Sequence, residues 1–335
     1  MTYLLQPLKV RSLTLANRLV MPPMATAKAE LDGQVSQAVL DYYAEKSRGG
    51  YISLIIIEHS YISPEGKASN NQLSASSDGM IPGLRKLAEV IHRNNSKAAM
   101  QINHAGSAAL KEVTGTTPLA PSATANPRRG DLPREMSRKE IGDIVIAFQD
   151  AARRVKEAGF DAVEIHSAHG YLLNQFLSPL TNKRTDEYGG DIANRIRIHL
   201  QVIEAVRTVV GPDFPVQVRL GASDYVEGGT TIEDSMAASR AFEKAGVDLI
   251  HISGGFVGYT PPGLFGQGYF APLSEAIKRA ATIPVILTGG ITEIEAAEKL
   301  LAEKKADLIG VGRAILQDST WAERAIKTLR SKEGL

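Results

Sequence analysis

Cysteine is absent from the 335-residue sequence. Without cysteine the protein cannot form disulfide bonds, use a thiolate nucleophile, or bind zinc or an iron–sulfur cluster through sulfur ligands. The lack of disulfides fits a reducing compartment, and we expect a cytoplasmic protein.

An excess of charge of one sign is also missing, because 38 lysines and arginines balance 37 aspartates and glutamates. Nucleic-acid-binding proteins are usually markedly basic. The longest apolar run, near residues 52–57, is far shorter than the roughly 20 residues that cross a bilayer. The first seven residues lack the basic and apolar regions of a signal peptide. We therefore expect neither nucleic-acid nor membrane partners.

Two glycine motifs that bind nucleotides are missing as well. The closest approach to the dinucleotide fingerprint, GVGRAI at 310–315, lacks the third glycine and precedes the last predicted helix instead of the first. No GxxxxGK[ST] phosphate loop occurs. These absences disfavour a doubly wound sheet.

What is present is an alternation of apolar strands and helical segments. Strands are predicted at 19–21, 53–58, 98–102, 161–166, 216–220, 249–253, 284–288 and 308–311, and helices near 36–48, 82–94, 137–159, 192–210, 232–244, 293–303 and 314–329. Such alternation produces parallel strands, and about eight units close into a barrel. We predict an α/β fold, a single (β/α)8 TIM barrel forming one domain over residues 1–335. An N-terminal hairpin at 8–15 and an excursion loop after the third strand, at 103–136, complete it.

Polar residues gather where the strand at 161–166 ends. His166, His169 and Tyr171 follow one another closely there. In a β/α barrel the chemistry lies at the C-terminal ends of the strands. Two histidines and a tyrosine can donate hydrogen bonds to an oxygen and deliver a proton. This trio is the candidate catalytic group, although structural histidines are an alternative.

Glycines follow the last two strands, as Gly289-Gly290 and as Gly312 before Arg313. Glycine lets backbone amides approach an anion, the following helix N-termini add positive potential, and an arginine contacts phosphate through its planar fork. Phosphate binding is favoured because the barrel's usual phosphate site lies here. A tight turn and a solvated arginine are the alternatives.

Two further polar residues lie on apolar strands. Gln101 can both donate and accept hydrogen bonds, which suits a heteroaromatic edge. Arg219 needs an anionic partner if it is buried. That partner is either a structural carboxylate, Glu164 or Asp224, or a cofactor ring that gains negative charge on reduction.

A metal site is a second reading of the histidine cluster. Two histidines are too few for zinc, so Glu164 would have to complete a site with His166 and His169. We therefore predict no metal. Among the other histidines, His92 and His199 are expected on helices as surface or packing residues, and His251 as a hydrogen-bonded interior residue.

Four segments together resemble the Old Yellow Enzyme family of FMN-dependent ene-reductases, the NADH:flavin oxidoreductases. They are NRLVMPPM at 17–24, QINHAG at 101–106, AGFDAVEIHSAHGY at 158–171, and QFLSPLTNKRTDEYGG at 175–190 with NR at 194–195. The resemblance extends from about Leu4 to Leu329 and is closest to the bacterial thermophilic-like subgroup, whose two histidines are retained.

The resemblance implies non-covalent FMN, with NADH or NADPH as reductant and an activated alkene as the small-molecule substrate. His166 and His169 would bind the carbonyl or nitro oxygen of the alkene, and Tyr171 would protonate its α-carbon. The expected cofactor-binding residues are Pro23, Met24, Ala25, Glu58, Gln101, Arg219, Gly289, Gly290, Gly312 and Arg313. The expected substrate-pocket residues are Thr26, Ala27 and His104.

The sequence departs from the family at several points. Ala25 replaces a cysteine or threonine that bonds the flavin ring in many relatives, with Thr26 as a candidate to compensate. Ala27 replaces a tyrosine common in the subgroup, which implies a differently shaped pocket. Relatives carry a C-terminal tail whose arginine reaches the neighbouring subunit, whereas this chain stops at Leu335, so we do not expect that shared site.

Other questions stay open at this stage. A homo-oligomer, the physiological substrate and the choice between NADH and NADPH are undecided. The competing functions are a metal-dependent hydrolase or lyase that uses His166, His169 and Glu164, and a non-catalytic flavin binder.

Overall fold

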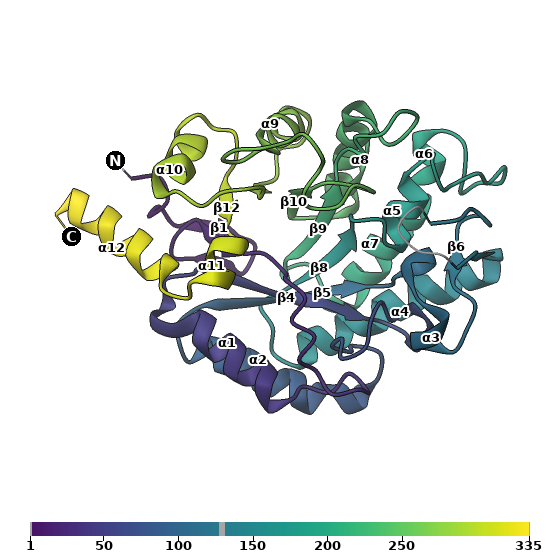
Figure 1. Cartoon of the computed structure of the whole chain (residues 1–335), viewed down its shortest axis with the longest axis horizontal. Helices are drawn as coiled ribbons and strands as arrows, with labels where there is room; N and C mark the ends of the chain where they lie inside the picture. The colour runs from purple at the N-terminus through teal and green to yellow at the C-terminus, as the bar shows by residue number, and fades with distance from the viewer. Residues whose placement is uncertain (1, 127–130, 335) are drawn as a thin grey trace.

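Eight parallel strands close into a barrel in the computed structural model, which describes residues 2–126 and 131–334 (Figure 1). Around the barrel the strands follow the order β10-β11-β12-β3-β4-β5-β8-β9. Their bounds are β3 Leu19–Met21, β4 Leu54–Tyr61, β5 Lys97–Asn103, β8 Ala162–Ser167, β9 Val216–Gly221, β10 Leu249–Ser253, β11 Val285–Leu287 and β12 Leu308–Gly310. The predicted TIM barrel is confirmed.

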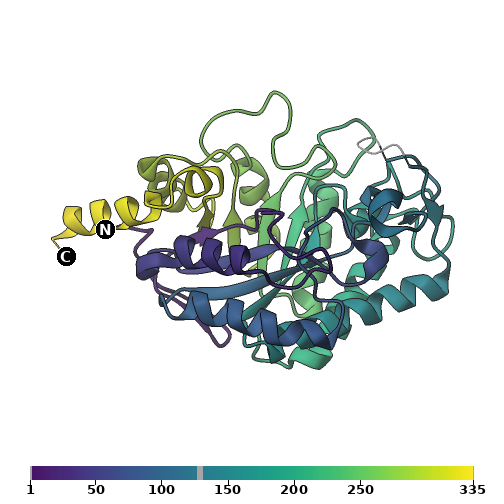
Figure 2. The same ribbon diagram turned by 60° about the horizontal axis from the view of Figure 1, so that its bottom comes forward.

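Helices surround the strands and bury an apolar face against them. The longer ones are α1 Gln37–Ser47, α2 Ile81–His92, α4 Arg138–Glu157, α7 Arg197–Val210, α8 Ile232–Ala245, α9 Ala271–Ala280, α10 Ile294–Ala302 and α12 Trp321–Glu333. Short helices are α3 Lys111–Thr114, α5 Leu172–Leu177, α6 Ile192–Arg195 and α11 Arg313–Gln317, and single 3₁₀ turns are η1 Arg48–Gly50, η2 Pro64–Gly66, η3 Asp78–Met80 and η4 Gly106–Ala108. Helix α12 extends away from the barrel on the side where both chain ends lie (Figure 2).

The N-terminal hairpin closes one end of the barrel. Strands β1 (Leu8–Val10) and β2 (Leu13–Leu15) pair antiparallel, as predicted. Their side chains pack with Leu54, Ala162 and Leu249, which lie at the N-terminal ends of barrel strands. Because this end is filled with apolar side chains, the opposite, C-terminal end is the one left for a site.

The predicted excursion after β5 is present and has local structure of its own. It contains η4, α3 and the short paired strands β6 (Leu119–Ala120) and β7 (Arg134–Glu135). Residues 127–130 of the predicted loop lie outside the described residues. The excursion ends at Ser137, whose hydroxyl accepts a hydrogen bond from the Glu140 backbone N–H, while the Glu140 carboxylate accepts one from the Ser137 backbone N–H. This capping box starts α4 as predicted.

Two helix predictions were wrong in detail, and one of the longer helices was missed. The segment 192–210 forms two helices, α6 and α7, which meet at Ile196 with φ −90° and ψ 0°. The segment 314–329 likewise divides into α11 and α12 around residues 318–320. Helix α9 was not predicted, because a loop rich in glycine and proline separates it from β10. Pro272 in its first turn is the signal that could have revealed it.

Candidate active site

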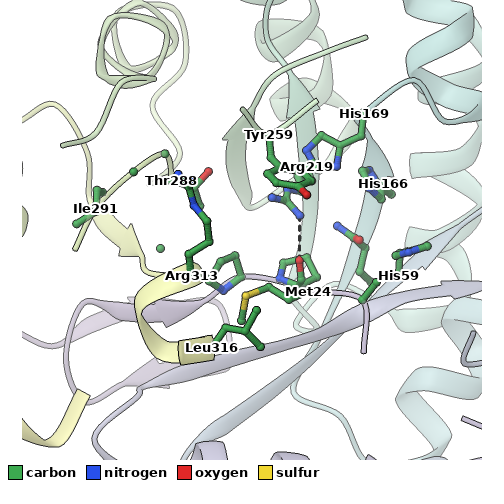
Figure 3. A pocket seen from close by; sticks show the side chains of 18 of the residues that line it. Met24, His59, His166, His169, Arg219, Tyr259, Thr288, Ile291, Arg313 and Leu316 are labelled. Carbon is green, nitrogen blue, oxygen red and sulfur yellow. Dashed lines mark hydrogen bonds between the residues drawn. The ribbon is translucent and has the colours of Figure 1, made fainter. Parts of the chain in front are cut away.

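A cavity of about 550 Å³ opens at the C-terminal ends of the strands, a size typical of cofactor sites. Figure 3 shows Arg313 and Ile291 at one end of this cavity and His59, His166 and His169 at the other. Most of the predicted site residues line it: Pro23, Met24, Ala25, Gln101, His166, His169, Tyr171, Arg219, Gly289, Gly290, Gly312 and Arg313.

Three aromatic side chains from one turn meet at the histidine end of the cavity. The ring centroids of His166 and His169 are 5.1 Å apart, and those of His166 and Tyr171 are 5.0 Å apart. The backbone makes this possible by turning through left-handed conformations at His169 (φ 61°) and Gly170 (φ 72°). Such φ values are uncommon outside glycine and cluster at functional sites. The turn folds His169 back beside His166.

The hydrogen bonds around His166 define which nitrogen carries its proton. Nδ1 accepts a hydrogen bond from the backbone N–H of Ala168 at 3.2 Å, so the proton of the neutral ring lies on Nε2. Burial, together with His169 and Arg219, lowers the pKa of His166 well below its usual range. His166 is therefore a neutral hydrogen-bond donor at pH 7. Its neighbour His169 is fixed by a 2.7 Å contact between Nε2 and the hydroxyl of Ser253.

A buried carboxylate, that of Glu164, connects two other side chains inside the barrel by hydrogen bonds. Glu164 is fully buried; its two oxygens contact Gln101 Nε2 at 2.7 Å and His251 Nδ1 at 2.8 Å. Because one N–H of the Gln101 amide is donated to Glu164, the amide oxygen and the second N–H are the groups left for a ligand. His251 is thus a hydrogen-bonded interior histidine, as expected.

Arg219 lies beside this network on β9, in register with His166 on β8. Its Nη1 donates to the backbone oxygen of Pro23 at 3.4 Å, the dashed contact in Figure 3. Burial lowers the pKa of Arg219 to about 10, and nearby Glu164 opposes that shift, so the guanidinium is charged at neutral pH. The other proposed partner, Asp224, instead binds Ser178 and the backbone amides of Thr230 and Phe256.

The opposite end of the cavity is built from close-packed backbone. Gly289 and Gly290 have φ values of 116° and 70°, which glycine adopts without strain. A side-chain carbon on Gly290 would lie 2.4 Å from the carbonyl oxygen of Gly266, and one on Gly310 would lie 2.5 Å from Thr288. These positions therefore require glycine, and they leave backbone amides close to exposed Arg313.

Glu58 does not line the cavity, contrary to its expected contact with the cofactor. Its carboxylate accepts hydrogen bonds from the backbone and, at 2.8 Å, from the hydroxyl of Thr26. The reason is a β-bulge: the register of β4 on β5 shifts between Ile57 and Ser60. A bulge redirects side chains. Here it brings His59 to the cavity in place of Glu58.

The three expected substrate-pocket residues also lie away from the cavity lining. Thr26 is bonded to Glu58, so its hydroxyl does not replace the hydrogen bond that Ala25 cannot make. Ala27 is exposed and has a left-handed backbone, φ 52°. The ring of His104 is buried against Gly66, with Nδ1 accepting from the amide of Gly106. His104 follows β5, which ends at Asn103, and its ring lies beside Glu65 and Gly66 instead of at the cavity.

The remaining histidines and carboxylates do not assemble a metal site within the described residues. The carboxylate of Glu164 is engaged by Gln101 and His251 instead of closing a site with the two cavity histidines. His92, the last residue of α2, has its Nε2 2.6 Å from the carboxylate of Asp161, which directly precedes β8. His199 is buried, stacked on Phe242, which agrees with its expected packing role.

Several lining residues were not predicted: Pro22, His59, Tyr259, Tyr269, Thr288, Ile291, Thr292, Gly310, Leu316 and Gln317. Thr288, a polar residue that ends a strand, carried a readable signal. Tyr259 and Tyr269 come from the loop between β10 and α9, where no strand end marks them. His59 was hidden by the bulge in β4, which the sequence does not reveal.

The family model of the NADH:flavin oxidoreductase / NADH oxidase family matches residues 3–332. The chain belongs to this family. It is therefore an FMN-dependent oxidoreductase that uses NADH or NADPH, and the resemblance to Old Yellow Enzyme is confirmed.

Similar proteins agree with this family. An NADH oxidase of Thermoanaerobacter brockii is 42% identical over 95% of this chain and 50% of its own length. An NADPH dehydrogenase of Listeria monocytogenes is 40% identical over 98% of this chain and 96% of its own. Among structures, a 2-naphthoyl-CoA reductase complex has a TM-score of 0.93 at 28% identity, covering 97% of this chain and 52% of that one. The Old Yellow Enzyme homologue of Zymomonas mobilis has a TM-score of 0.84 at 27% identity, covering 97% and 92%. The chain thus spans about half the length of the oxidase and of the naphthoyl-CoA reductase.

The cavity of this oxidoreductase fits FMN in its chemistry. The backbone around Gly290 and Gly312, with Arg313, suits the phosphate. The apolar side chains of Pro23 and Met24 suit a ring face. Gln101 and Arg219 suit the polar ring edge, because one offers an amide oxygen and the other a buried positive charge.

In the described part of the chain, no helix is long and apolar enough to span a membrane.

Proposed function

We propose that the protein is an ene-reductase, which reduces the C=C bond of α,β-unsaturated carbonyl or nitro compounds. The observation that carries this proposal is the grouping of His166, His169 and Tyr171 at one end of a cavity suited to FMN. Two N–H donors for an oxygen and one O–H donor for a carbon are the groups that this reaction requires.

FMN, when bound, would supply hydride, with NADH or NADPH as the source of electrons. His166 donates its Nε2 hydrogen, and His169 a second hydrogen bond, to the carbonyl or nitro oxygen of the alkene. These bonds stabilise the negative charge that develops on that oxygen. Tyr171, whose ring packs against His166, delivers a proton to the α-carbon. Gln101, Arg219 and Arg313 would hold the cofactor.

The metal-dependent hydrolase or lyase is the weaker reading. Its third ligand would be Glu164, and that carboxylate already serves Gln101 and His251 inside the barrel. A non-catalytic flavin binder would not need the trio at the cavity. The name of the Thermoanaerobacter relative, an NADH oxidase, suggests oxygen as an alternative electron acceptor. The following experiment distinguishes oxygen from an alkene as the acceptor.

The test is steady-state turnover of the purified yellow protein with NADPH or NADH and cyclohex-2-enone under nitrogen. We expect one cyclohexanone for each nicotinamide oxidised. A protein that oxidises NADPH only when oxygen is admitted, and forms no cyclohexanone, would show that the alkene is not its acceptor.

The role of His166 has a separate readout. Phenols bind through their oxygen beside flavins and produce a long-wavelength charge-transfer band, so His166→Ala should weaken para-chlorophenol binding roughly tenfold or more. His92→Ala, which alters a histidine on α2 remote from the cavity, is the matched control. An unchanged titration for His166→Ala would remove this residue from the oxygen-binding pair.

A further inference from the structure

His59 is a third histidine of the cavity, and the expected oxygen-binding pair does not include it. It lies on β4 at the bulge, from which its ring reaches the same end of the cavity as His166 and His169 (Figure 3). The ring centroids of His59 and His166 are 6.4 Å apart. Since the mechanism above uses only two histidines, this residue requires an account of its own.

The side chain of Gln72 determines the proton position on His59. Its amide oxygen accepts from the backbone of Ala68 at 2.7 Å, which identifies the other amide atom as nitrogen. That nitrogen contacts both the carbonyl oxygen of His59, at 2.9 Å, and Nδ1, at 2.8 Å. An amide nitrogen can only donate, so Nδ1 must accept and the proton of the neutral ring lies on Nε2.

The ring of His59 is neutral at physiological pH. Burial, with a contribution from Arg219, lowers the pKa of His59 to about 4. Across residues 2–126 and 131–334, no hydrogen bond engages its Nε2. The ring therefore offers an N–H donor to the cavity without a charge.

The neighbours of His59 place that donor beside the reacting groups. Its ring stacks on Tyr171, with centroids 5.2 Å apart and planes inclined by 30°. Tyr171 in turn lies 5.0 Å from His166. A ligand oxygen held by His166 and His169 is thus bound within one small cavity that also contains the His59 donor.

We propose that His59 is a specificity-determining residue whose Nε2–H binds a second oxygen of the ligand, so that the cavity prefers compounds with two carbonyl groups, such as cyclic imides. This deepens the proposed function, on which it rests. The Nε2–H of a neutral histidine can donate only one hydrogen bond, and a carbonyl oxygen can accept it. A site built to bond two oxygens disfavours a ligand with one, because a donor is then left unpaired.

The test compares two saturated five-membered rings that cannot be reduced, N-methylsuccinimide and N-methylpyrrolidin-2-one. They differ by one carbonyl group. Binding to the oxidised FMN-loaded protein is measured from the change in the flavin absorbance spectrum. We expect the imide to bind about tenfold more tightly, the equivalent of one hydrogen bond of about 1.4 kcal/mol. The lactam carbonyl is the stronger acceptor, so the His166–His169 pair alone would not produce this preference.

His59→Phe keeps a ring against Tyr171 and removes the donor, so the imide preference should fall to about twofold or less, while lactam binding changes little. His59→Met and His59→Gln form a matched pair of similar size, of which only the glutamine donates; glutamine should retain part of the preference. His92→Phe is the control and should behave as wild type.

An equal affinity of the wild type for both ligands would overturn the proposal, as would a preference that survives in His59→Phe and His59→Met. If both ligands weaken equally, or if every His59 variant loses FMN, then His59 supports the cofactor or the fold and the proposal fails. Because neither probe is reduced, the result does not depend on ene-reductase turnover. A wild type that prefers the imide yet fails to reduce cyclohex-2-enone would refute the proposed function alone.

Discussion

Glu164 organises the interior of the site, and its replacement by leucine gives the sharpest structural prediction. The residue is fully buried, and its carboxylate binds Gln101 Nε2 at 2.7 Å and His251 Nδ1 at 2.8 Å. It also lies close enough to Arg219 to oppose the lowering of that arginine's pKa. Leucine preserves much of the volume but leaves both neighbouring groups without an acceptor.

The expected cost follows from the two lost contacts. Hydrogen bonds to a charged group contribute about 1.5–3 kcal/mol each, and removing one member of a buried charged network costs about 3–5 kcal/mol. We therefore expect Glu164→Leu to lower the free energy of unfolding by about 3–5 kcal/mol. Glu164→Gln keeps an acceptor for Gln101 and should lose about half as much. FMN should also bind roughly tenfold more weakly to Glu164→Leu, because the amide of Gln101 is no longer held with its oxygen toward the cavity.

The assay is denaturant unfolding of the FMN-saturated protein, combined with equilibrium dialysis of FMN. Glu275→Leu on α9 is the control, since its ion pair with Arg279 is exposed and contributes less than about 1 kcal/mol. If Glu164→Leu unfolds at the denaturant concentration of the wild type and retains FMN equally well, the carboxylate does not organise the site as described.

Three further predictions concern the cofactor and the pH dependence of stability. Arg313→Met should weaken FMN binding about tenfold, with a smaller difference at high salt, because the arginine is exposed; an unchanged dissociation constant from dialysis would place the phosphate elsewhere. Burial raises the pKa of Glu58 to about 7, against about 4.3 in the unfolded chain. The folded protein therefore binds the proton of the Glu58 carboxyl group more tightly than the unfolded chain does. The free energy of unfolding of the wild type should therefore fall by up to about 3 kcal/mol between pH 4.5 and 7.5, whereas that of Glu58→Gln should not show this loss. Parallel pH profiles of urea unfolding for the two proteins would contradict this. Gly290→Ala should reduce both stability and FMN content, because its new carbon would meet the Gly266 oxygen at 2.4 Å on a backbone with φ 70°; a variant purified with full FMN would refute it.

The barrel could be predicted because each strand–helix unit carries its own local pattern. The apolar run of β4 and the capping box at Ser137 report directly on nearby backbone. Helix boundaries were less accessible, because no glycine or proline marks the break at Ile196 in the sequence.

The site was predictable wherever strand alternation holds. His166 and Arg219 occupy matched register positions on neighbouring strands, and both line the cavity. Alternation fails at the bulge in β4, where a single extra residue exchanges the directions of Glu58 and His59. No local pattern in the sequence marks that extra residue, because a bulge is defined by pairing with β5. Tyr259 reaches the cavity from a long loop, whose path depends on tertiary contacts.

The roles of the cavity residues are tested most directly by rapid mixing of wild type and Tyr171→Phe in two half-reactions. Under anaerobic conditions, the flavin is first reduced by NADPH or NADH and then reoxidised by cyclohex-2-enone. We expect flavin reduction to change less than about twofold in Tyr171→Phe, because no proton from the tyrosine is needed there. Reoxidation by the alkene should slow by about 10²–10⁴-fold, the usual contribution of a general acid. Equal rates of alkene reoxidation in the two proteins, or equal losses in both half-reactions, would contradict the account.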